Sequence, residues 1–258
     1  MNALNLLRKT GADVLVAVQF LTRIPVPAPP YEPDSLSRAV KFFPFVGLLV
    51  GSTAAVVHLL LVPHLPRLIT SLFVIIFLVL VTGCFHEDGL ADTADGFGGG
   101  SSRDRILIIL KDSRIGSYGG AALMLSLLAR VLLLASLPLT LIAPYLVAAH
   151  VLCRWTTLPL SYYLSSAHTQ EEIGVGQGAR IARLTTRGTL IVGSFFSFAI
   201  VAVMLRSRAV PAIAAAILVS LLSGLYYKQR IGGVTGDCFG ATNQLTEIVV
   251  YLAGVWVA

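Results

Sequence analysis

Long runs of apolar residues, separated by short polar segments, occupy most of the chain. A helix needs about 20 mostly apolar residues to cross a bilayer, with about 17 to 25 tolerated. Six runs meet this requirement, and they cover residues 42–62, 68–85, 119–137, 139–160, 188–205 and 209–227. A seventh run, 245–258, is short: it crosses if its helix begins near Thr242, and otherwise ends within the bilayer or on its surface. The pattern predicts six to seven transmembrane helices.

The N-terminal segment predicts a different kind of helix. Val14, Ala17, Val18 and Leu21 recur at helical spacing, but Asp13 and other polar residues interrupt the apolar run. Such a pattern favours an interfacial helix, lying along the membrane face, over one that crosses the bilayer.

Composition supports a membrane protein. Of the 258 residues, 56% are hydrophobic and only 12% are charged, against about 25% charged in an average soluble domain. A soluble fold of this size has too little interior for so much apolar side chain, so lipid is the expected solvent. We predict one all-α polytopic membrane domain over residues 1–258, in contact with the lipid bilayer. A homo-oligomer is compatible with this prediction.

The distribution of basic residues predicts the orientation. If the N-terminus is cytoplasmic and all seven runs cross, the inside segments are 1–41, 86–118, 161–187 and 228–244. They carry 14 lysines and arginines, against 3 in the outside segments, and such an excess marks cytoplasmic loops. The protein is therefore expected in the cell inner membrane, with its long polar loops facing the cytoplasm. The net charge of +6 does not indicate nucleic acid, because the basic residues are not gathered into one stripe with interleaved aromatic residues.

Acidic residues are concentrated in one inside loop. Six of the 13 acidic residues lie between Glu87 and Asp112. If the second membrane helix continues into this loop, Asp88, Asp92 and Asp95 fall within an arc of about 60°. Carboxylates on one face repel each other unless a cation lies between them, and oxygen ligands suit Mg²⁺ or, as an alternative, Mn²⁺. We predict a metal site made by Glu87, Asp88, Asp92 and Asp95. The alternative is a polar helix end that is simply solvated. Such an end usually mixes lysines with the acidic residues, and no lysine lies among these.

Glycines and cations follow the acidic residues. Consecutive glycines can present their amides to an anion, or they can form a flexible hinge. The cations suit phosphate oxygens, or they anchor the end of a membrane helix. Asp112 either binds metal or orients Arg114. The candidate phosphate-binding residues of this segment are Gly98, Gly99, Gly100, Arg103, Lys111, Asp112 and Arg114.

The last inside loop, 228–244, is rich in glycine and predicts a second ligand-binding turn, with a plain loop as the alternative. Its candidate residues are Gly236, Asp237 and Asn243. Arg130 and Arg154 fall inside predicted membrane helices, where a charge is costly unless it is paired or reaches water or a ligand.

Several of these motifs together resemble the cobalamin synthase family, also called adenosylcobinamide-GDP ribazoletransferase or cobalamin 5′-phosphate synthase. The resemblance rests on FLTRIP, FPFVG, HEDGLADTADGFGGG, KDSRIGSYG and GGVTGDCFGA, which follow in order from residue 20 to about residue 247. It implies a Mg²⁺-dependent enzyme that joins adenosylcobinamide-GDP to α-ribazole or its 5′-phosphate and releases GMP. This reaction belongs to the last steps of vitamin B12 assembly.

For such a reaction we expect the acidic residues to hold one or two Mg²⁺ ions against the diphosphate of the corrinoid. The ribose 3′-hydroxyl of α-ribazole would attack the phosphorus on the cobinamide side, and Asp95 or Asp237 would accept its proton. CDP-alcohol phosphotransferases are one alternative, but their D-G-x-x-A-R motif has an arginine where this chain has Asp92. Aspartate-rich prenyltransferases and transporters are further alternatives.

Overall fold

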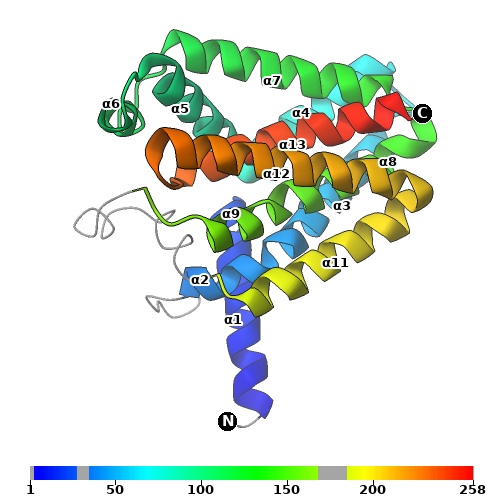
Figure 1. The fold of residues 1–258 in the computed structure, drawn as a ribbon. Coiled ribbons are helices and arrows are strands. Elements are labelled where there is room, and N and C mark those ends of the chain that lie inside the picture. Colours follow the sequence, from blue (N-terminus) through cyan, green and yellow to red (C-terminus); the bar gives the residue numbers. More distant parts are fainter. Residues whose placement is uncertain (1–2, 28–34, 168–184, 258) are drawn as a thin grey trace.

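The computed structural model describes residues 3–27, 35–167 and 185–257, and within these ranges the protein is helical (Figure 1). Its β structure there is limited to one isolated bridge between Ser166 and Val234. The helices are α1 (Ala3–Leu21), α2 (Ser35–Ala39), η1 (Val40–Phe42), α3 (Phe43–Leu61), α4 (Arg67–Thr82), α5 (Phe85–Gly99), α6 (Arg103–Ile109), α7 (Ser117–Ser136), α8 (Leu139–Trp155), α9 (Thr157–Tyr163), α11 (Arg187–Leu205), η2 (Arg206–Arg208), α12 (Ala209–Ile231) and α13 (Gly236–Trp256).

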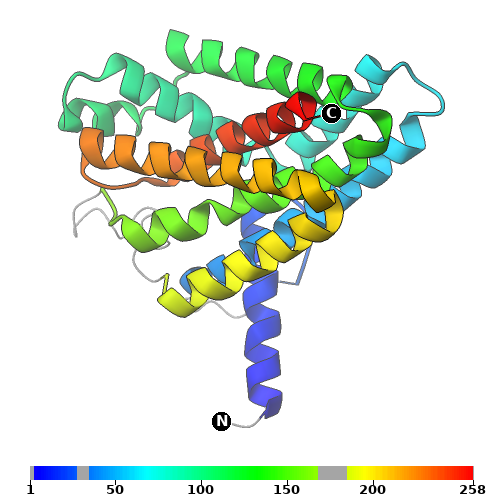
Figure 2. The ribbon, with the colours of Figure 1, turned by 45° about the vertical axis from the view of Figure 1, so that its right-hand side comes forward.

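The long helices α3, α7, α8, α11, α12 and α13 run across the molecule, whereas α1 crosses their direction at a steep angle (Figures 1 and 2). Helix α8 is the centre of the bundle, because α3, α11 and α13 all pack against it. The contact with α3 is close at Gly47 and Gly51, where a Cβ atom would meet the backbone of α8. Small residues that lie four positions apart in the sequence allow two membrane helices to approach this closely.

The outer faces of α7, α11 and α12 are apolar and exposed, as expected for helices in contact with lipid. Their large exposed side chains include Met124, Leu125, Phe195, Val203 and Val210. By length and composition, four helical segments of the described chain can cross a membrane, or five if the bent pair of α4 and α5 forms one span. The protein is thus an all-α polytopic membrane protein, and the number of spans stays a prediction.

Each of the six predicted runs coincides with a helix or helix pair. The start of the seventh helix differs from the prediction. Helix α13 begins at Gly236, before the predicted start near Thr242, and has 21 residues. That length corresponds to about 31 Å. The side chain of Thr235 accepts a hydrogen bond from the amide of Cys238 and so caps this helix. Its polar residues, such as Asn243 and Glu247, are buried against other helices, so they do not interrupt it.

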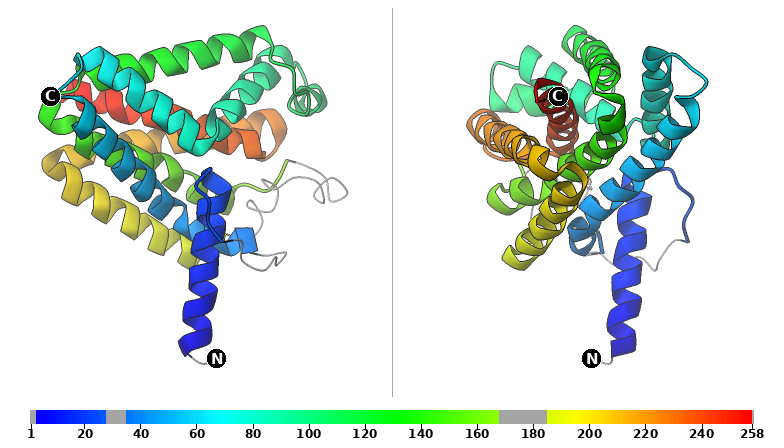
Figure 3. Two further views of the ribbon diagram at one scale, coloured as in Figure 1. Left: turned by 180° about the vertical axis from the view of Figure 1, so that it is seen from behind. Right: turned by 90° about the vertical axis from the view of Figure 1, so that its right-hand side faces the viewer.

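The second membrane helix does not continue unbroken into the acidic loop, although Asp88, Asp92 and Asp95 do share one helix, α5. Helix α4 ends at Thr82, and α5 sets off at 89° to it (Figure 3, left). Gly83 and Cys84 both have left-handed backbones, with φ of +65° and +60°, a conformation that cannot continue a right-handed helix. The acidic residues therefore belong to a separate helix that is nearly perpendicular to α4.

The ends of α5, α9 and α12, the start of α13 and helix α6 all lie at one side of the molecule, on the left in Figure 1. Two of the polar segments are joined there, because the amide of Ala167 donates to the carbonyl of Val234 at 3.0 Å. The amide of Val234 donates in turn to Ser165, also at 3.0 Å. The described parts of the long polar loops therefore converge at one end of the bundle.

Candidate active site

Helices α5 and α13 cross in close contact, and this crossing builds the site. A Cβ atom on Gly89 would lie 2.9 Å from the carbonyl oxygen of Asp237 and 3.1 Å from the Cα atom of Gly240. A Cβ atom on Gly240 would lie 3.1 Å from the Cα atom of Gly89. Because both positions lack a side chain, the two backbones touch. The acidic motif and the second polar loop, about 150 residues apart in sequence, are brought together in this way.

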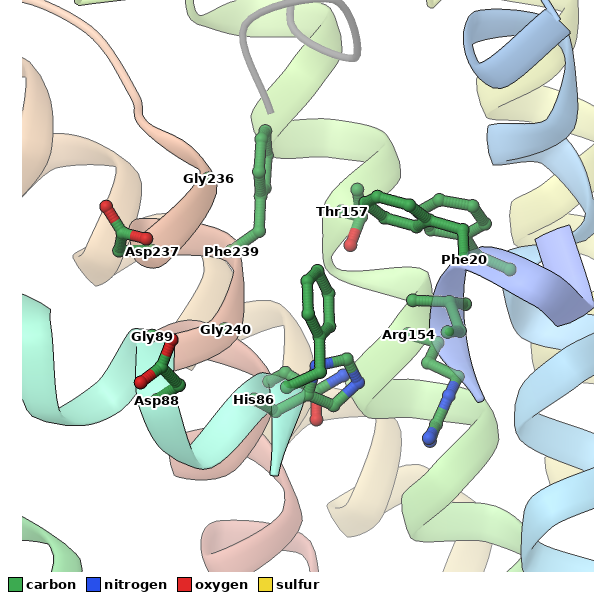
Figure 4. A pocket seen from close by; sticks show the side chains of 14 residues that line it. Phe20, His86, Asp88, Gly89, Arg154, Thr157, Gly236, Asp237, Phe239 and Gly240 are labelled. Carbon is green, nitrogen blue, oxygen red and sulfur yellow. The ribbon is translucent and has the colours of Figure 1, made fainter. Parts of the chain in front are cut away.

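Aspartates from the two helices meet beside this crossing. Asp88 and Asp237 line the same cavity, Asp88 from α5 and Asp237 from the first turn of α13 (Figure 4). Asp92 lies one turn beyond Asp88, and the charges of Asp237, Asp88 and Asp95 all act on it. Like charges at close range destabilise each other. Such a cluster is favourable only when a cation or a proton offsets the repulsion.

The cavity has a volume of about 180 Å³, and part of its wall is aromatic. Phe20 from α1 stacks on Phe43 from α3, with ring centroids 5.7 Å apart, and meets the edge of Phe85 at 5.0 Å. Phe239 from α13 adds a further ring. The polar part of the wall contains His86, Arg154, Thr157 and Asn243. A flat, partly apolar molecule with polar substituents suits such a wall.

Asp95 holds the loop before α7 against α5. Its two carboxylate oxygens accept hydrogen bonds from the amide of Gly116 at 2.6 Å and from the amide of Gly119 at 2.8 Å. It thus satisfies amides at the start of α7 that have no partner within their own helix. Neither glycine has room for a Cβ atom, because the carboxylate of Asp95 occupies that space. The KDSRIGSYG block is held to the acidic helix by this contact.

Replacing Asp95 with alanine is expected to lower the stability of the protein by about 2 kcal/mol, because two amide donors lose their acceptor. Asp95→Asn should lose less, since one acceptor oxygen remains. Thermal unfolding in detergent measures both, with Asp104→Ala on the exposed side of α6 as control. An Asp95→Ala protein as stable as the control would contradict the capping role.

Glu87, predicted as a metal ligand, lies in a buried ion pair. Its Oε1 atom is 3.0 Å from Nη2 of Arg130 on α7, and Nη1 of Arg130 is 3.4 Å from Oε2 of Glu247 on α13. Gln244 also donates to Glu87, at 3.4 Å. Because two carboxylates pair with Arg130, its charge is tolerated inside a membrane helix. This network also links the acidic helix to α7 and α13.

The glycine run does not form the expected loop of consecutive amides. Gly98 and Gly99 belong to the last turn of α5, and Gly100 ends it. A Cβ atom on Gly98 would lie 2.6 Å from the ring of Tyr118, and one on Gly100 would lie 2.5 Å from the side chain of Ile106. In this structure the small size of these residues serves helix packing, and phosphate binding by them stays a prediction.

The arginines of the predicted phosphate site bind protein groups in this structure. Arg103 donates to the carbonyls of Ile231 at 3.1 Å and Ala167 at 2.6 Å, so it ties α6 to the two other polar segments. Arg114 forms a fork with Asp112, with nitrogen–oxygen distances of 2.6 and 2.9 Å. Lys111 belongs to the same exposed connection between α6 and α7.

Of the two roles predicted for Asp112, the structure favours the orientation of Arg114. The side chain and the backbone amide of Arg114 donate to its carboxylate, and these hydrogen bonds lower the pKa of Asp112 to about 2. Asp112 is therefore ionised throughout the neutral pH range.

The cavity includes residues that sequence reasoning did not assign. Thr157 and Phe85 were seen only as part of membrane segments, whereas Arg154 was noted as a costly charge inside one, and Phe20, Phe43 and Phe239 only as members of the motifs of the family resemblance. Arg154 gave a signal, since a charge inside a membrane helix requires a partner. An aromatic residue by itself does not indicate a cavity wall, so the phenylalanines could not be assigned to one. Asn243 and Gly236, both predicted, do line the cavity.

The aspartates suit a hard divalent cation as a partial ligand set. No group of three or more His, Cys, Asp or Glu side chains within the described ranges is placed to hold a metal ion by itself. Mg²⁺, however, usually keeps several water molecules and takes only one or two carboxylates together with substrate phosphates. That requirement is matched in donor type by Asp88 and Asp237, which line one cavity, and by Asp92, one turn beyond Asp88.

Fold and site together define a polytopic membrane protein with an acidic, aromatic-walled cavity, an arrangement suited to a transferase with phosphate-bearing substrates. The chain belongs to the cobalamin-5-phosphate synthase family, whose pattern it matches over residues 13–255.

Curated relatives span nearly the whole chain. A protein of Vibrio cholerae named adenosylcobinamide-GDP ribazoletransferase is 39% identical, and the match covers 92% of this chain and 91% of the relative. Proteins of the same name from Polaromonas sp. and Shewanella frigidimarina are 38% and 40% identical, over 93% and 92% of this chain and 95% and 91% of theirs. No solved structure matches the chain.

Proposed function

We propose that this protein is an adenosylcobinamide-GDP ribazoletransferase. It joins adenosylcobinamide-GDP to α-ribazole or α-ribazole 5′-phosphate, and it forms adenosylcobalamin or its 5′-phosphate with release of GMP. The family membership and the names of the relatives support this substrate pair. The observation that carries the proposal in the structure is the α5–α13 crossing, beside which Asp88 and Asp237 line one aromatic-walled cavity and Asp92 lies one turn beyond Asp88.

In this proposal, Asp88, Asp92 and Asp237 hold Mg²⁺, with Mn²⁺ as a substitute, against the diphosphate of the corrinoid substrate. The bound cation would neutralise the negative charge that develops on the departing GMP. Glu87 and Asp95 are left out of this ligand set, because Glu87 pairs with Arg130 and Asp95 binds the amides of Gly116 and Gly119.

The bond change occurs at the phosphorus on the cobinamide side of the diphosphate. The ribose 3′-hydroxyl of the ribazole attacks this phosphorus, a new phosphodiester forms, and the bond to the GMP phosphate breaks. The hydroxyl proton passes to a carboxylate. Of the two candidates, Asp237 lines the cavity, and both oxygens of Asp95 accept amide hydrogen bonds. We therefore assign the proton to Asp237, to an oxygen that does not hold the cation.

The reaction is proposed to take place at the cytoplasmic face of the inner membrane. The polar segments 86–118, 161–167 and 228–244 are joined at one end of the bundle, and six of the 14 basic residues that predict the cytoplasmic side lie in them.

The test is GMP release by the purified protein in lipid nanodiscs, given adenosylcobinamide-GDP and α-ribazole or its 5′-phosphate. We expect release to require the corrinoid, a ribazole substrate and Mg²⁺, to stop with EDTA, and to resume with excess Mg²⁺ or Mn²⁺. Absence of GMP under all conditions would contradict the assigned reaction. Release that EDTA does not affect would contradict the metal assignment alone. Release of CMP from a CDP-alcohol would favour the alternative class of phosphotransferase.

A further inference from the structure

Two arginines are buried in the helical bundle, and their surroundings differ. Arg130 and Arg154 are each 1% exposed. Arg130 has carboxylates of Glu87 and Glu247 at 3.0 and 3.4 Å. Within the described ranges, Arg154 has no carboxylate at ion-pair distance. The ring of His150 lies beside it, and the Nε2 atom of that ring is 3.8 Å from Oε1 of Glu247.

The hydrogen bonds of Arg154 are confined to one nitrogen. Its Nη1 atom lies 3.1 Å from Nδ1 of His150 and 3.3 Å from the carbonyl oxygen of the same residue. The Nε and Nη2 atoms are buried and have no partner among the described residues. A buried guanidinium donor that lacks an acceptor costs free energy, so the protein carries this cost for a group that lines a cavity.

Other polar atoms on the same wall also lack partners. Both ring nitrogens of His86 and the Oδ1 atom of Asn243 are buried without a hydrogen bond in the described structure. Figure 4 shows the side chains of Arg154 and Thr157 on one side of the pocket and those of Asp88 and Asp237 on the other. The cavity therefore has a cationic side and an anionic side, with aromatic rings as part of its wall.

We propose that Arg154 binds the 5′-phosphate of α-ribazole 5′-phosphate and thereby determines which ribazole substrate the enzyme prefers. This inference rests on the proposed function. The Nε and Nη2 donors of an arginine match two phosphate oxygens, and Thr157 offers a hydroxyl on the same side of the pocket. The 5′-phosphate and the 3′-hydroxyl lie on different sides of a ribose ring. A phosphate on Arg154 therefore directs the 3′-hydroxyl towards the aspartates, while the flat base packs against the phenylalanine rings.

A phosphate on Arg154 could also come from the diphosphate of the corrinoid substrate. We assign the ribazole phosphate, because the diphosphate is the group that the cation on the aspartate side would bind. The two sources predict different effects of an Arg154 substitution, so one set of kinetic measurements separates them.

The experiment compares Arg154→Met with the wild type, each assayed with α-ribazole 5′-phosphate and with α-ribazole. We expect the KM for the phosphate form to rise about 30-fold, the size of effect that charge-assisted hydrogen bonds produce. The KM for α-ribazole should change less than about twofold, since a substrate without the phosphate never made that contact. Arg154→Lys should recover part of the affinity, and Arg105→Met, which removes an exposed arginine of α6, should leave both KM values unchanged.

Equal losses with both ribazole substrates, or a raised KM for adenosylcobinamide-GDP alone, would overturn the proposal in favour of a diphosphate contact or a structural role. If Arg154→Met fails to fold, the wild type and Thr157→Val decide the question by direct binding of each ribazole without corrinoid. Tighter binding of the phosphate form by the wild type, weakened in Thr157→Val, supports the proposal, and equal binding of both forms contradicts it. Binding also separates this inference from the proposed function, because a wild type that binds the phosphate form but releases no GMP would refute only the reaction.

Discussion

Asp237→Asn is expected to reduce the rate of GMP release by about 1000-fold, which corresponds to about 4 kcal/mol of lost transition-state stabilisation. The substitution keeps the shape of the side chain and removes one of the charges that would hold the cation. Asp92→Asn should have a similar effect, because the same cluster loses a carboxylate. The assay is GMP release at saturating Mg²⁺ and saturating substrates.

The two variants should also be more stable than the wild type when Mg²⁺ is absent. Removal of one charge relieves the mutual repulsion of the aspartates, and a gain of about 1 kcal/mol would raise the unfolding temperature by about 2–4 °C. Asp104→Asn, an exposed position on α6, serves as control for both measurements. Near-normal GMP release by either variant would remove that aspartate from the site.

Gly89→Val is expected to abolish activity by separating α5 from α13. The Cβ atom alone would lie 2.9 Å from a backbone oxygen and 3.1 Å from a Cα atom of α13. Backbone atoms cannot move aside as a flexible side chain can, so the helices must shift. Overpacking of this kind costs about 1–3 kcal/mol. The separation also moves Asp237 away from Asp88, so activity should fall far more than stability.

The matched control for this prediction is Gly120→Ala on α7. A Cβ atom at Gly120 meets nothing within 4 Å, and alanine in a helix is about 1 kcal/mol more favourable than glycine. This variant should retain full activity and unfold at a slightly higher temperature. A Gly89→Val enzyme that turns over as fast as the Gly120→Ala enzyme would show that the close crossing is not needed for the site.

Most of the helical bundle could be predicted from the sequence, because an apolar run of sufficient length has few alternatives to a membrane helix. Two features could not. The turn at Gly83 and Cys84 lies at the end of an apolar run, and a cysteine with a left-handed backbone has no reliable signal in sequence. The early start of α13 was hidden because Asn243, Gln244 and Glu247 lower the hydropathy of its first half, although all three are buried.

The site was predictable in part. The clustering of Asp88 and Asp92, and the glycine-rich segment around Asp237, drew attention to the right region. Asp88 and Asp237 line one cavity, and the charge of Asp237 acts on Asp92. The partners of Glu87, Asp95 and Arg103 could not be predicted, because each contact joins segments far apart in the chain. Sequence also does not distinguish a glycine that approaches a ligand from one that approaches another helix. In this structure Gly98 approaches the ring of Tyr118 on α7, and Gly89 both approaches α13 and lines the cavity.

Binding of Mn²⁺ in place of Mg²⁺, followed by electron paramagnetic resonance in the presence of adenosylcobinamide-GDP, tests most directly whether aspartates of both helices hold a cation. The account predicts saturable binding to the wild type and weaker binding to Asp92→Asn and Asp237→Asn alike, with Asp104→Asn unchanged. Binding that is absent in the wild type, or that persists undiminished when both aspartates are replaced, would contradict a cation site shared between α5 and α13.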